Sequence, residues 1–292
     1  MSTPSASERT KITISDLQAK KEKGQPITMV TAYDFPTAVL VERSGIDVVL
    51  VGDSLAMVVL GYENTVSVTM EEMLHHCRAV ARGARHPLLV GDMPFMSYQV
   101  SVPQAIENAG RFLKEAGMDV VKLEGGKERA EVVRAIVGAG VPVMGHIGLT
   151  PQTISKLGGF RVQGKSVEAG LRLIADALAL EEAGCFSLVL EGMPERVAAL
   201  ITEKVSIPTI GIGAGRHCDG QVLVLHDMLG LFDRFTPKFV KQYARFFEEG
   251  VRALREYVAD VENGAFPLPE HTYAMPDDVY AALAAEAEKL GR

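Results

Sequence analysis

The stretch VVLVGD (residues 48–53) decides the fold, because it is a continuous apolar run that ends on an acid. The same pattern recurs in LLVGD (88–92), VVKLE (120–124) and LVLE (188–191). Apolar runs of this length are typical of strands buried on both faces, as in parallel sheets. Each run therefore delivers a carboxylate to one edge of the sheet. If the sheet closes into a barrel, these strand ends surround a single mouth and form an oxygen-rich site for a cation.

Eight such segments recur at regular intervals, and we predict that each is a strand. They are ITMVTAYD (27–34), VVLVGD (48–53), LLVGDMP (88–94), VVKLEGG (120–126), VPVMGHIG (141–148), SLVLEGMP (187–194), PTIGIGAG (208–215) and QVLVLHD (221–227). Most intervals carry helix signals: Thr69 with Glu72 and Ser101 with Gln104 match the capping-box pattern. This alternation predicts an α/β protein with a (β/α)8 TIM barrel, and an open doubly wound sheet is the main alternative.

One interval is too short for a helix. Only RHCDG (216–220) lies between the seventh strand segment and the eighth. A parallel crossover normally needs about a dozen residues. Either the seventh crossover is reduced to a turn, or the last two strands are assigned wrongly.

Helices are also predicted at both ends of the chain. ISDLQAKKEKG (14–24) predicts a short N-terminal helix that ends at Gly24. Residues 237–260 form a long amphipathic pattern that opens with Pro237, a residue suited to the first turn of a helix. A terminal helix is expected near 277–290, so the chain ends in a helical tail.

The composition fits a single large domain with tails. The 292 residues are 47% hydrophobic and 23% charged, and we predict a barrel domain over 1–272 and a peripheral extension over 273–292. A formal charge of −7 without basic runs argues against nucleic acid and anionic membranes as partners and favours small-molecule substrates. The sequence has no run of eighteen apolar residues and no apolar signal segment, so we expect a cytoplasmic protein. Three widely spaced cysteines indicate neither a disulfide framework nor a thiolate metal cluster.

Asp53 and Asp92 each follow a glycine at the end of an apolar run. An aspartate in this position can simply cap the helix that follows. Two acids with the same Gly-Asp ending also provide the hard oxygen ligands that suit Mg²⁺, whereas Zn²⁺ would favour His or Cys. We therefore predict that they form part of a magnesium site.

Lys122 and Glu124 lie two residues apart on one strand, so their side chains point to the same face. They could form a buried ion pair, although such pairs contribute little net stability because desolvation opposes the attraction. We favour an interpretation in which Lys122 receives a substrate carboxylate and Glu124 lies in or near the metal shell.

Glu191 and His146 also lie at strand ends. Glu191 can be a third metal ligand, a cap for the helix predicted in MPERVAAL (193–200), or a general base. His146, in VMGHIG (143–148), is either a structural imidazole or a catalytic one.

Two glycine-containing segments lie at the predicted mouth. TPQTISKLGGFRVQGKS (150–166) is long and basic, and we predict a lid over the substrate. GIGAG (211–215) is a weak nucleotide-binding signal, because no helix of normal length follows it. Close backbone packing at the mouth is the simpler interpretation.

Seven segments, in this order and spacing, resemble the ketopantoate hydroxymethyltransferase (3-methyl-2-oxobutanoate hydroxymethyltransferase) family from about residue 12 to about residue 270. They are GDSLAMVVLGYENTVSVTMEEM, LLVGDMPFMSY, VKLEGG, VMGHIGLTPQ, KLGGFRVQGK, LVLEGMP and PTIGIGAG. The resemblance implies a (β/α)8 barrel that assembles as a homodecamer, binds one Mg²⁺ per subunit and acts in pantothenate and coenzyme A biosynthesis.

The same resemblance implies roles for individual residues. Asp53 and Asp92 would ligate the metal, and Glu124 would complete its shell directly or through water. The residues implied for the 2-oxo acid are Asp53, Ser54, Asp92 and Lys122. Glu191 would accept the proton, and His146 would line the same mouth as a second catalytic residue.

The implied reaction moves a one-carbon hydroxymethyl unit from 5,10-methylenetetrahydrofolate to 3-methyl-2-oxobutanoate, giving 2-dehydropantoate and tetrahydrofolate through a magnesium-stabilised enolate. The alternative is another magnesium-dependent 2-oxo acid lyase or mutase on a phosphoenolpyruvate/pyruvate-type barrel. Such lyases carry a reactive cysteine motif in a mouth loop, which this sequence lacks. A barrel without catalysis would be expected to lack some of the carboxylates, and none is missing.

Overall fold

The barrel is closed by eight parallel strands that follow one another in sequence order. This computed structural model describes residues 10–153, 159 and 161–290. The strands are β1 (Ile27–Thr31), β2 (Val48–Val51), β3 (Leu88–Asp92), β4 (Val120–Glu124), β5 (Val143–Gly148), β6 (Ser187–Glu191), β7 (Thr209–Ile212) and β8 (Gly220–Leu223). Because β8 also pairs with β1, the predicted (β/α)8 barrel is confirmed and the open sheet is wrong.

Alternating side chains divide the apolar core into two layers. In β2, Val49 and Val51 pack outward against the helices, whereas Val48 and Leu50 belong to the cluster inside the barrel. Leu17 of α1 (Ile14–Glu22) belongs to the inner cluster and is fully buried. The predicted N-terminal helix is thus confirmed, and it contributes to the barrel interior.

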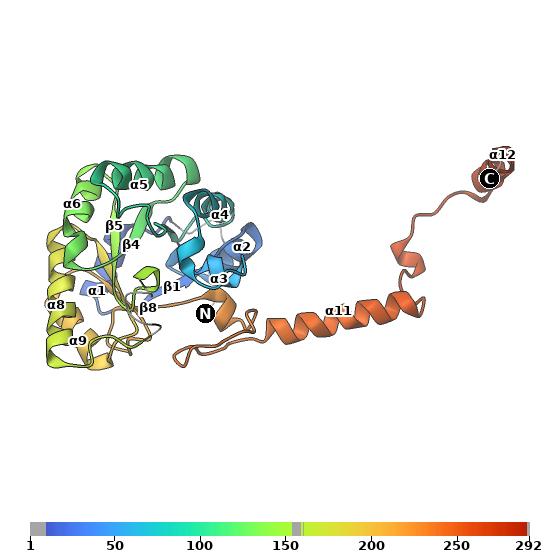
Figure 1. Cartoon of the computed structure of the whole chain (residues 1–292). Helices are drawn as coiled ribbons and strands as arrows, with labels where there is room; N and C mark the ends of the chain where they lie inside the picture. The colour runs from blue at the N-terminus through green and yellow to red at the C-terminus, as the bar shows by residue number, and fades with distance from the viewer. Residues whose placement is uncertain (1–9, 154–158, 160, 291–292) are drawn as a thin grey trace. The chain divides into compact units, whose positions relative to one another are not determined.

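Helices cover the outside of the barrel (Figure 1). The longer ones are α2 (Phe35–Ser44), α4 (Met70–Gly83), α5 (Val102–Ala116), α6 (Ala130–Gly138), α8 (Val167–Glu182) and α9 (Glu195–Lys204); the short ones are α3 (Leu55–Val58), η2 (Thr65–Ser67), η3 (Lys127–Arg129), η4 (Pro151–Thr153) and α10 (Leu225–Met228). Thr69 and Glu72 form the predicted capping box of α4. Ser101 caps α5 by accepting the backbone N–H of Gln104 at 3.4 Å.

The seventh crossover is reduced to a turn, as one of the two sequence interpretations required. Strands β7 and β8 are parallel neighbours joined by residues 213–219 alone. Gly213 and Gly215 adopt positive φ angles of 61° and 83° in this turn, a conformation that glycine accepts without strain. The assignment of both strands is therefore confirmed.

The amphipathic helix predicted from residue 237 begins nine residues later. Helix α11 spans Phe246–Glu262, and Pro237 instead begins a turn in which the N–H of Val240 donates to its carbonyl at 3.0 Å. The N–H of Tyr243 donates to the carbonyl of Met228 at 2.7 Å. Such contacts with the barrel replace the helical hydrogen bonds of this segment, so the apolar periodicity before residue 246 was misleading.

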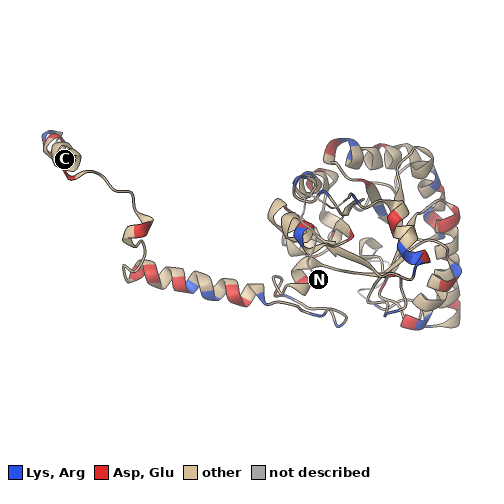
Figure 2. Cartoon of the chain, turned by 180° about the vertical axis from the view of Figure 1, so that it is seen from behind, with Lys and Arg blue, Asp and Glu red and all other residues tan. Residues whose placement is uncertain are grey.

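Internal contacts group the chain into residues 1–244 and 245–292. The second group contains α11, η5 (Pro269–His271) and α12 (Asp277–Lys289), which confirms the predicted terminal helix. Acidic and basic side chains both occur along α11 (Figure 2). The domain limits of 1–272 and 273–292 remain a prediction. Within the described residues, none of the helices has the length and apolar character needed to span a membrane.

Replacing Leu17 by alanine tests how much α1 contributes to the barrel. Because Leu17 is fully buried, the variant should lose about 2–5 kcal/mol of unfolding free energy. Chemical denaturation measures this loss. Leu171→Ala is the control, because Leu171 is 61% exposed on α8 and should change stability by less than about 0.5 kcal/mol. Equal effects of the two variants would contradict the assignment.

Candidate active site

The carboxyl ends of the strands surround a cavity of about 380 Å³. All seven residues singled out from the sequence line it, although they come from five strands and the turns that follow them. They are Asp53, Ser54, Asp92, Lys122, Glu124, His146 and Glu191. The barrel therefore brings these positions together at one mouth, as predicted.

Asp53 and Asp92 lie against each other at the ends of β2 and β3, and they are 5% and 1% exposed. The backbone N–H of Asp53 donates to Oδ2 of Asp92 at 3.0 Å. Neither aspartate caps a helix, because Ser54, Thr69 and Ser101 occupy the cap positions of α3, α4 and α5. The capping interpretation is therefore wrong.

Burial raises the pKa of both aspartates above the usual range. The charges of Asp92 and Glu124 raise the pKa of Asp53 further, whereas Lys122 lowers the pKa of Asp92 and so opposes its burial. Crowded carboxylates of this kind are stabilised by a cation. The donor set therefore favours a positively charged ligand between them.

Lys122 on β4 provides one positive charge. Its Nζ lies 2.8 Å from Oδ1 of Asp92 and 3.3 Å from Nδ1 of His146. Burial lowers the pKa of Lys122, but the carboxylates of Asp92, Glu124 and Asp53 outweigh it and raise the pKa above its ordinary value. The side chain therefore remains an ammonium, and its ion pair is with Asp92, not with its neighbour on the strand.

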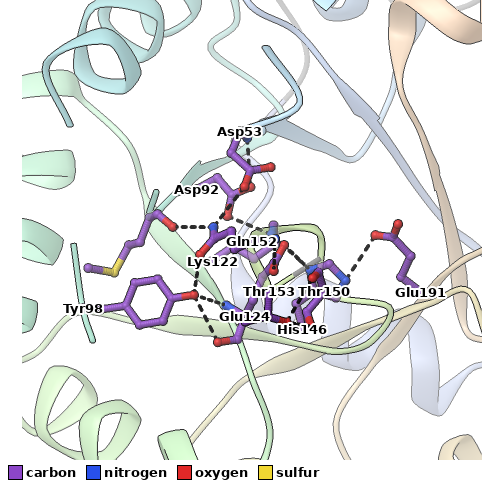
Figure 3. A network of polar contacts seen from close by, with 11 residues as sticks. Asp53, Asp92, Tyr98, Lys122, Glu124, His146, Thr150, Gln152, Thr153 and Glu191 are labelled. Carbon is purple, nitrogen blue, oxygen red and sulfur yellow. Dashed lines mark hydrogen bonds and ion pairs between the residues drawn. The ribbon is translucent and has the colours of Figure 1, made fainter. Parts of the chain in front are cut away.

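His146 on β5 connects two carboxylates, as Figure 3 shows. Its Nδ1 lies 3.4 Å from Oε1 of Glu124, and its Nε2 lies 3.2 Å from Oε2 of Glu191. Burial and Lys122 lower the pKa of His146, but the two glutamates raise it more, to about 9. An imidazolium therefore lies between Glu124 and Glu191 at neutral pH. Glu191 does not cap α9, because Pro194 occupies that position.

Gln152 of η4 belongs to the buried polar network of the site, although sequence reasoning did not single it out. Its Nε2 donates to Oδ2 of Asp53 at 3.0 Å, and its backbone N–H donates to Oε2 of Glu124 at 3.0 Å. Its Oε1 accepts the hydroxyl of Tyr98 at 2.7 Å (Figure 3). Gln152 thus joins two of the buried acids. Its position in the motif VMGHIGLTPQ was the only signal, because a lone glutamine indicates no chemistry.

Two further predictions concern the rim of the mouth. The hydroxyl groups of Ser54 and Tyr33 are 2.8 Å apart, which fixes the serine at the cavity wall. In the GIGAG segment, a Cβ at Gly215 would lie 2.3 Å from Cγ of Glu195, and one at Gly213 would lie 2.8 Å from Cδ1 of Phe239. These distances support the interpretation that the glycines permit close packing.

Comparison with known proteins identifies the family. The sequence model of ketopantoate hydroxymethyltransferase matches residues 11–269. The chain belongs to the ketopantoate hydroxymethyltransferase family. It is 59% identical to 3-methyl-2-oxobutanoate hydroxymethyltransferase of Moorella thermoacetica over 266 residues, covering 91% of this chain and 99% of the relative. The enzyme of the same name from Syntrophobacter fumaroxidans is 58% identical over 269 residues, with 92% and 95% covered.

Solved structures outside this family share the fold. Phosphonopyruvate hydrolase in complex with oxalate and Mg²⁺ matches with a TM-score of 0.58 and 13% identity, over 95% of this chain and 96% of the other. 2,3-Dimethylmalate lyase matches with a TM-score of 0.57 and 12% identity, over 95% and 96%. Similarity at this level shows the fold alone. The lyase or mutase alternative therefore has only a distant structural relationship in its favour.

The residues of this ketopantoate hydroxymethyltransferase family member fit a hard divalent cation. Buried carboxylate oxygens are the donors that Mg²⁺ prefers, and Mg²⁺ usually takes one or two carboxylates and fills its remaining positions with water and substrate. Among the residues that the structure describes, no group of three or more His, Cys, Asp or Glu side chains is arranged as a metal cage. Gln152 donates to both Glu124 and Asp53, and Lys122 contacts Asp92, so each of the three acids already has a neighbouring donor. The choice of Asp53 and Asp92 as metal ligands, with Glu124 completing the shell, remains a prediction.

The predicted lid at 150–166 lies partly outside the described residues, which omit 154–158 and 160. Of the described part, Pro151, Arg161 and Val162 line the cavity. The segment therefore borders the site, and its closing over a substrate remains a prediction.

The histidine pKa gives a test of this geometry in metal-free protein. The folded-state pKa of about 9 exceeds the ordinary histidine value of about 6.5, so proton binding by His146 stabilises the folded state. This stabilisation is complete below pH 6.5 and is lost as the pH rises through about 9. NMR titration of the imidazole and unfolding experiments across this range measure both effects. His146→Gln should remove this part of the pH dependence, and a titration below pH 7 would contradict the contacts described.

Proposed function

We propose that this protein transfers a hydroxymethyl unit from 5,10-methylenetetrahydrofolate to 3-methyl-2-oxobutanoate, giving 2-dehydropantoate and tetrahydrofolate. The observation that carries the proposal is the pairing of a buried cluster, formed by Asp53, Asp92 and Lys122, with a separate carboxylate, Glu191, in one cavity. Family membership and relatives at 58–59% identity support the substrates.

Lys122 and Ser54 are proposed to bind the 2-oxo acid. The substrate carries a carboxylate, and the buried ammonium of Lys122 provides a charge that is not screened by water. Asp92 holds this ammonium at 2.8 Å, so its position is set before the substrate arrives. Preorganised charge of this kind avoids reorganisation during the reaction.

Asp53 and Asp92 would hold the magnesium ion, and Glu124 would complete its shell directly or through water. When bound, the ion would stabilise the negative charge that develops on the keto oxygen as the enolate forms. Burial raises the pKa of both aspartates, which is consistent with a site that becomes fully ionised only beside a cation. A fold neighbour solved with oxalate and Mg²⁺ has only 13% identity, so this assignment depends on the donor set of this chain.

Glu191 is proposed to remove the proton at C3. Its side chain is 16% exposed, compared with 2% for Glu124, so it is the more accessible of the two glutamates that contact His146. The imidazolium of His146 lies 3.2 Å from the carboxylate of Glu191 and would orient it toward the substrate. Glu124 on the opposite side balances the charge of His146.

The carbon–carbon bond then forms between C3 of the substrate and the one-carbon unit of the folate. The electron pair left by the C3 proton makes this bond, and water supplies the hydroxyl group as tetrahydrofolate is released. No protein nucleophile is required. All three free cysteines have a pKa raised by burial, so they remain thiols.

We also propose that the protein works in the cytoplasm as a homodecamer with one Mg²⁺ per subunit. Family resemblance supports this assembly, and the mass in solution tests it. Distant fold neighbours named as lyases and mutases carry no specific observation that favours their chemistry here.

Exchange of the C3 hydrogen of 3-methyl-2-oxobutanoate for deuterium, with Mg²⁺ and without folate, tests the base. Glu191→Gln keeps the shape of the side chain but removes its basicity, so exchange should slow by about 100-fold or more. Glu195→Gln is the matched control, because Glu195 is 43% exposed and does not line the cavity. Exchange by Glu191→Gln at the parental rate would refute the base assignment, and no exchange by the parent would refute the enolate mechanism.

Calorimetric titration with Mg²⁺ alone tests the ligands independently of turnover. Asp53→Asn and Asp92→Asn should each weaken Mg²⁺ binding by about tenfold or more, because each removes a charged oxygen donor. Asp233→Asn, an exposed acid outside the cavity wall, should bind as the parent does. Unchanged affinity in both ligand variants would place the magnesium elsewhere.

A further inference from the structure

The polar cluster occupies only one arc of the mouth. Its members lie on strands β3 to β6 or directly after β2. Strands β7, β8 and β1 form the rest of the mouth, which we call the second arc. This second arc contributes Ile212, Val222 and Val224 to the cavity wall, so its surface is mainly apolar. The proposed chemistry of the 2-oxo acid uses none of these residues.

Among the residues that the structure describes, Asp227 is the one acid that the second arc contributes to the cavity wall. It lies in α10, directly after β8, and is 8% exposed. Its carboxylate has no hydrogen-bond or ion-pair partner among the residues that the structure describes. Burial raises its pKa to about 6, so it is mainly ionised at neutral pH. Because Asp227 lines the cavity, its oxygens are open to a ligand that supplies hydrogen-bond donors.

Aromatic side chains continue the wall beyond Asp227. Phe232, Phe235 and Phe239 all line the cavity, and the last two are 68% and 43% exposed. Phe239 packs over Gly213 at the end of β7, where a side chain would displace it. Flat apolar surfaces beside a buried acceptor suit a planar heterocycle that carries N–H donors.

Two exposed basic residues also line the cavity. Lys238 lies between the aromatic residues of the second arc in sequence, and Arg161 lies on the segment after β5, in the first arc. Exposed cations at the entrance of a pocket attract anionic groups that remain partly in water. The second arc, which forms one half of the cavity wall, therefore combines a buried carboxylate, an aromatic surface and a positive charge at the entrance of the cavity.

We propose that this half of the cavity binds the folate co-substrate, with Asp227 accepting hydrogen bonds from its pterin ring. The proposal rests on the proposed function and deepens it. The pyrimidine part of a pterin presents a ring N–H and an amino group side by side, and the two oxygens of a carboxylate match these donors. The ring stacks on the phenylalanines, and the glutamyl carboxylates extend toward Lys238 and Arg161. The one-carbon unit then lies between the two halves of the cavity.

Asp227→Asn tests the acceptor, because asparagine keeps the shape but loses one acceptor oxygen and the charge. The KM for 5,10-methylenetetrahydrofolate should rise by about tenfold or more, and calorimetry should show a similar loss of tetrahydrofolate binding. The KM for 3-methyl-2-oxobutanoate and the rate of C3 exchange without folate should stay within about twofold. Asp233→Asn, an exposed acid of the same segment, is the control and should match the parent in every assay.

A second variant tests the inference independently if Asp227→Asn fails to fold. Phe235→Ala removes an exposed ring and should weaken tetrahydrofolate binding by about fivefold or more, by analogy with ring stacking on bases. Phe35→Ala, on α2 and 49% exposed outside the cavity wall, is its control. At pH 8 the melting temperature of Asp227→Asn should rise, because the variant removes an unpaired buried charge.

The outcomes separate this inference from the proposed function. Unchanged folate affinity in both Asp227→Asn and Phe235→Ala overturns the inference. A loss of C3 exchange in Asp227→Asn places this residue with the 2-oxo acid and overturns it as well. If the parent catalyses no C3 exchange, the proposed enolate chemistry fails, whereas tetrahydrofolate binding by the parent and its loss in the variants would still support the second half as a pterin site.

Discussion

The ion pair between Lys122 and Asp92 is the interaction on which the mouth of the barrel depends. Closure of the sheet brings Asp53, Asp92 and Glu124 into a space with little water, where carboxylates repel one another. Lys122 offsets part of this repulsion at 2.8 Å, and His146 offsets more beside Glu124. The balance still favours an additional cation. The same need for buried positive charge underlies the proposed magnesium site.

Gln152 fixes the positions of these charged side chains relative to one another. It donates to Asp53 and Glu124 and accepts from Tyr98, so three elements that are distant in sequence are held at fixed separations. Both side-chain polar atoms of Gln152 have partners, so any shift of this side chain would leave a buried group without one. The neutral amide does this without altering the net charge of the site. Gln152 therefore holds the two acids in position.

Much of the fold followed from local pattern, because apolar runs ending on acids at regular intervals are compatible with few architectures besides the closed parallel barrel. The same pattern located Asp53, Asp92, Glu124 and Glu191, since strand ends must meet at the mouth. Gln152 could not be found in this way, because its function depends on contacts with residues distant in sequence. The start of α11 was wrong for a related reason: tertiary hydrogen bonds of residues 237–245 override an apolar periodicity that is equally suitable for a helix.

No helix connects β7 to β8 within the described residues, and the boundary between these two strands has the shortest ladder of paired residues in the barrel. The ladder there consists of Ile210 with Gly220 and Gly211 with Gln221, whereas every other neighbouring pair has three or more such partners. Asp219 holds the turn by an ion pair with Lys21 of α1 at 2.8 Å. Helix α1 therefore stabilises the boundary between β7 and β8 at the end of the barrel opposite the cavity. We expect local opening of the sheet to begin at this boundary, beside the apolar part of the cavity wall, while the charged part keeps its contacts.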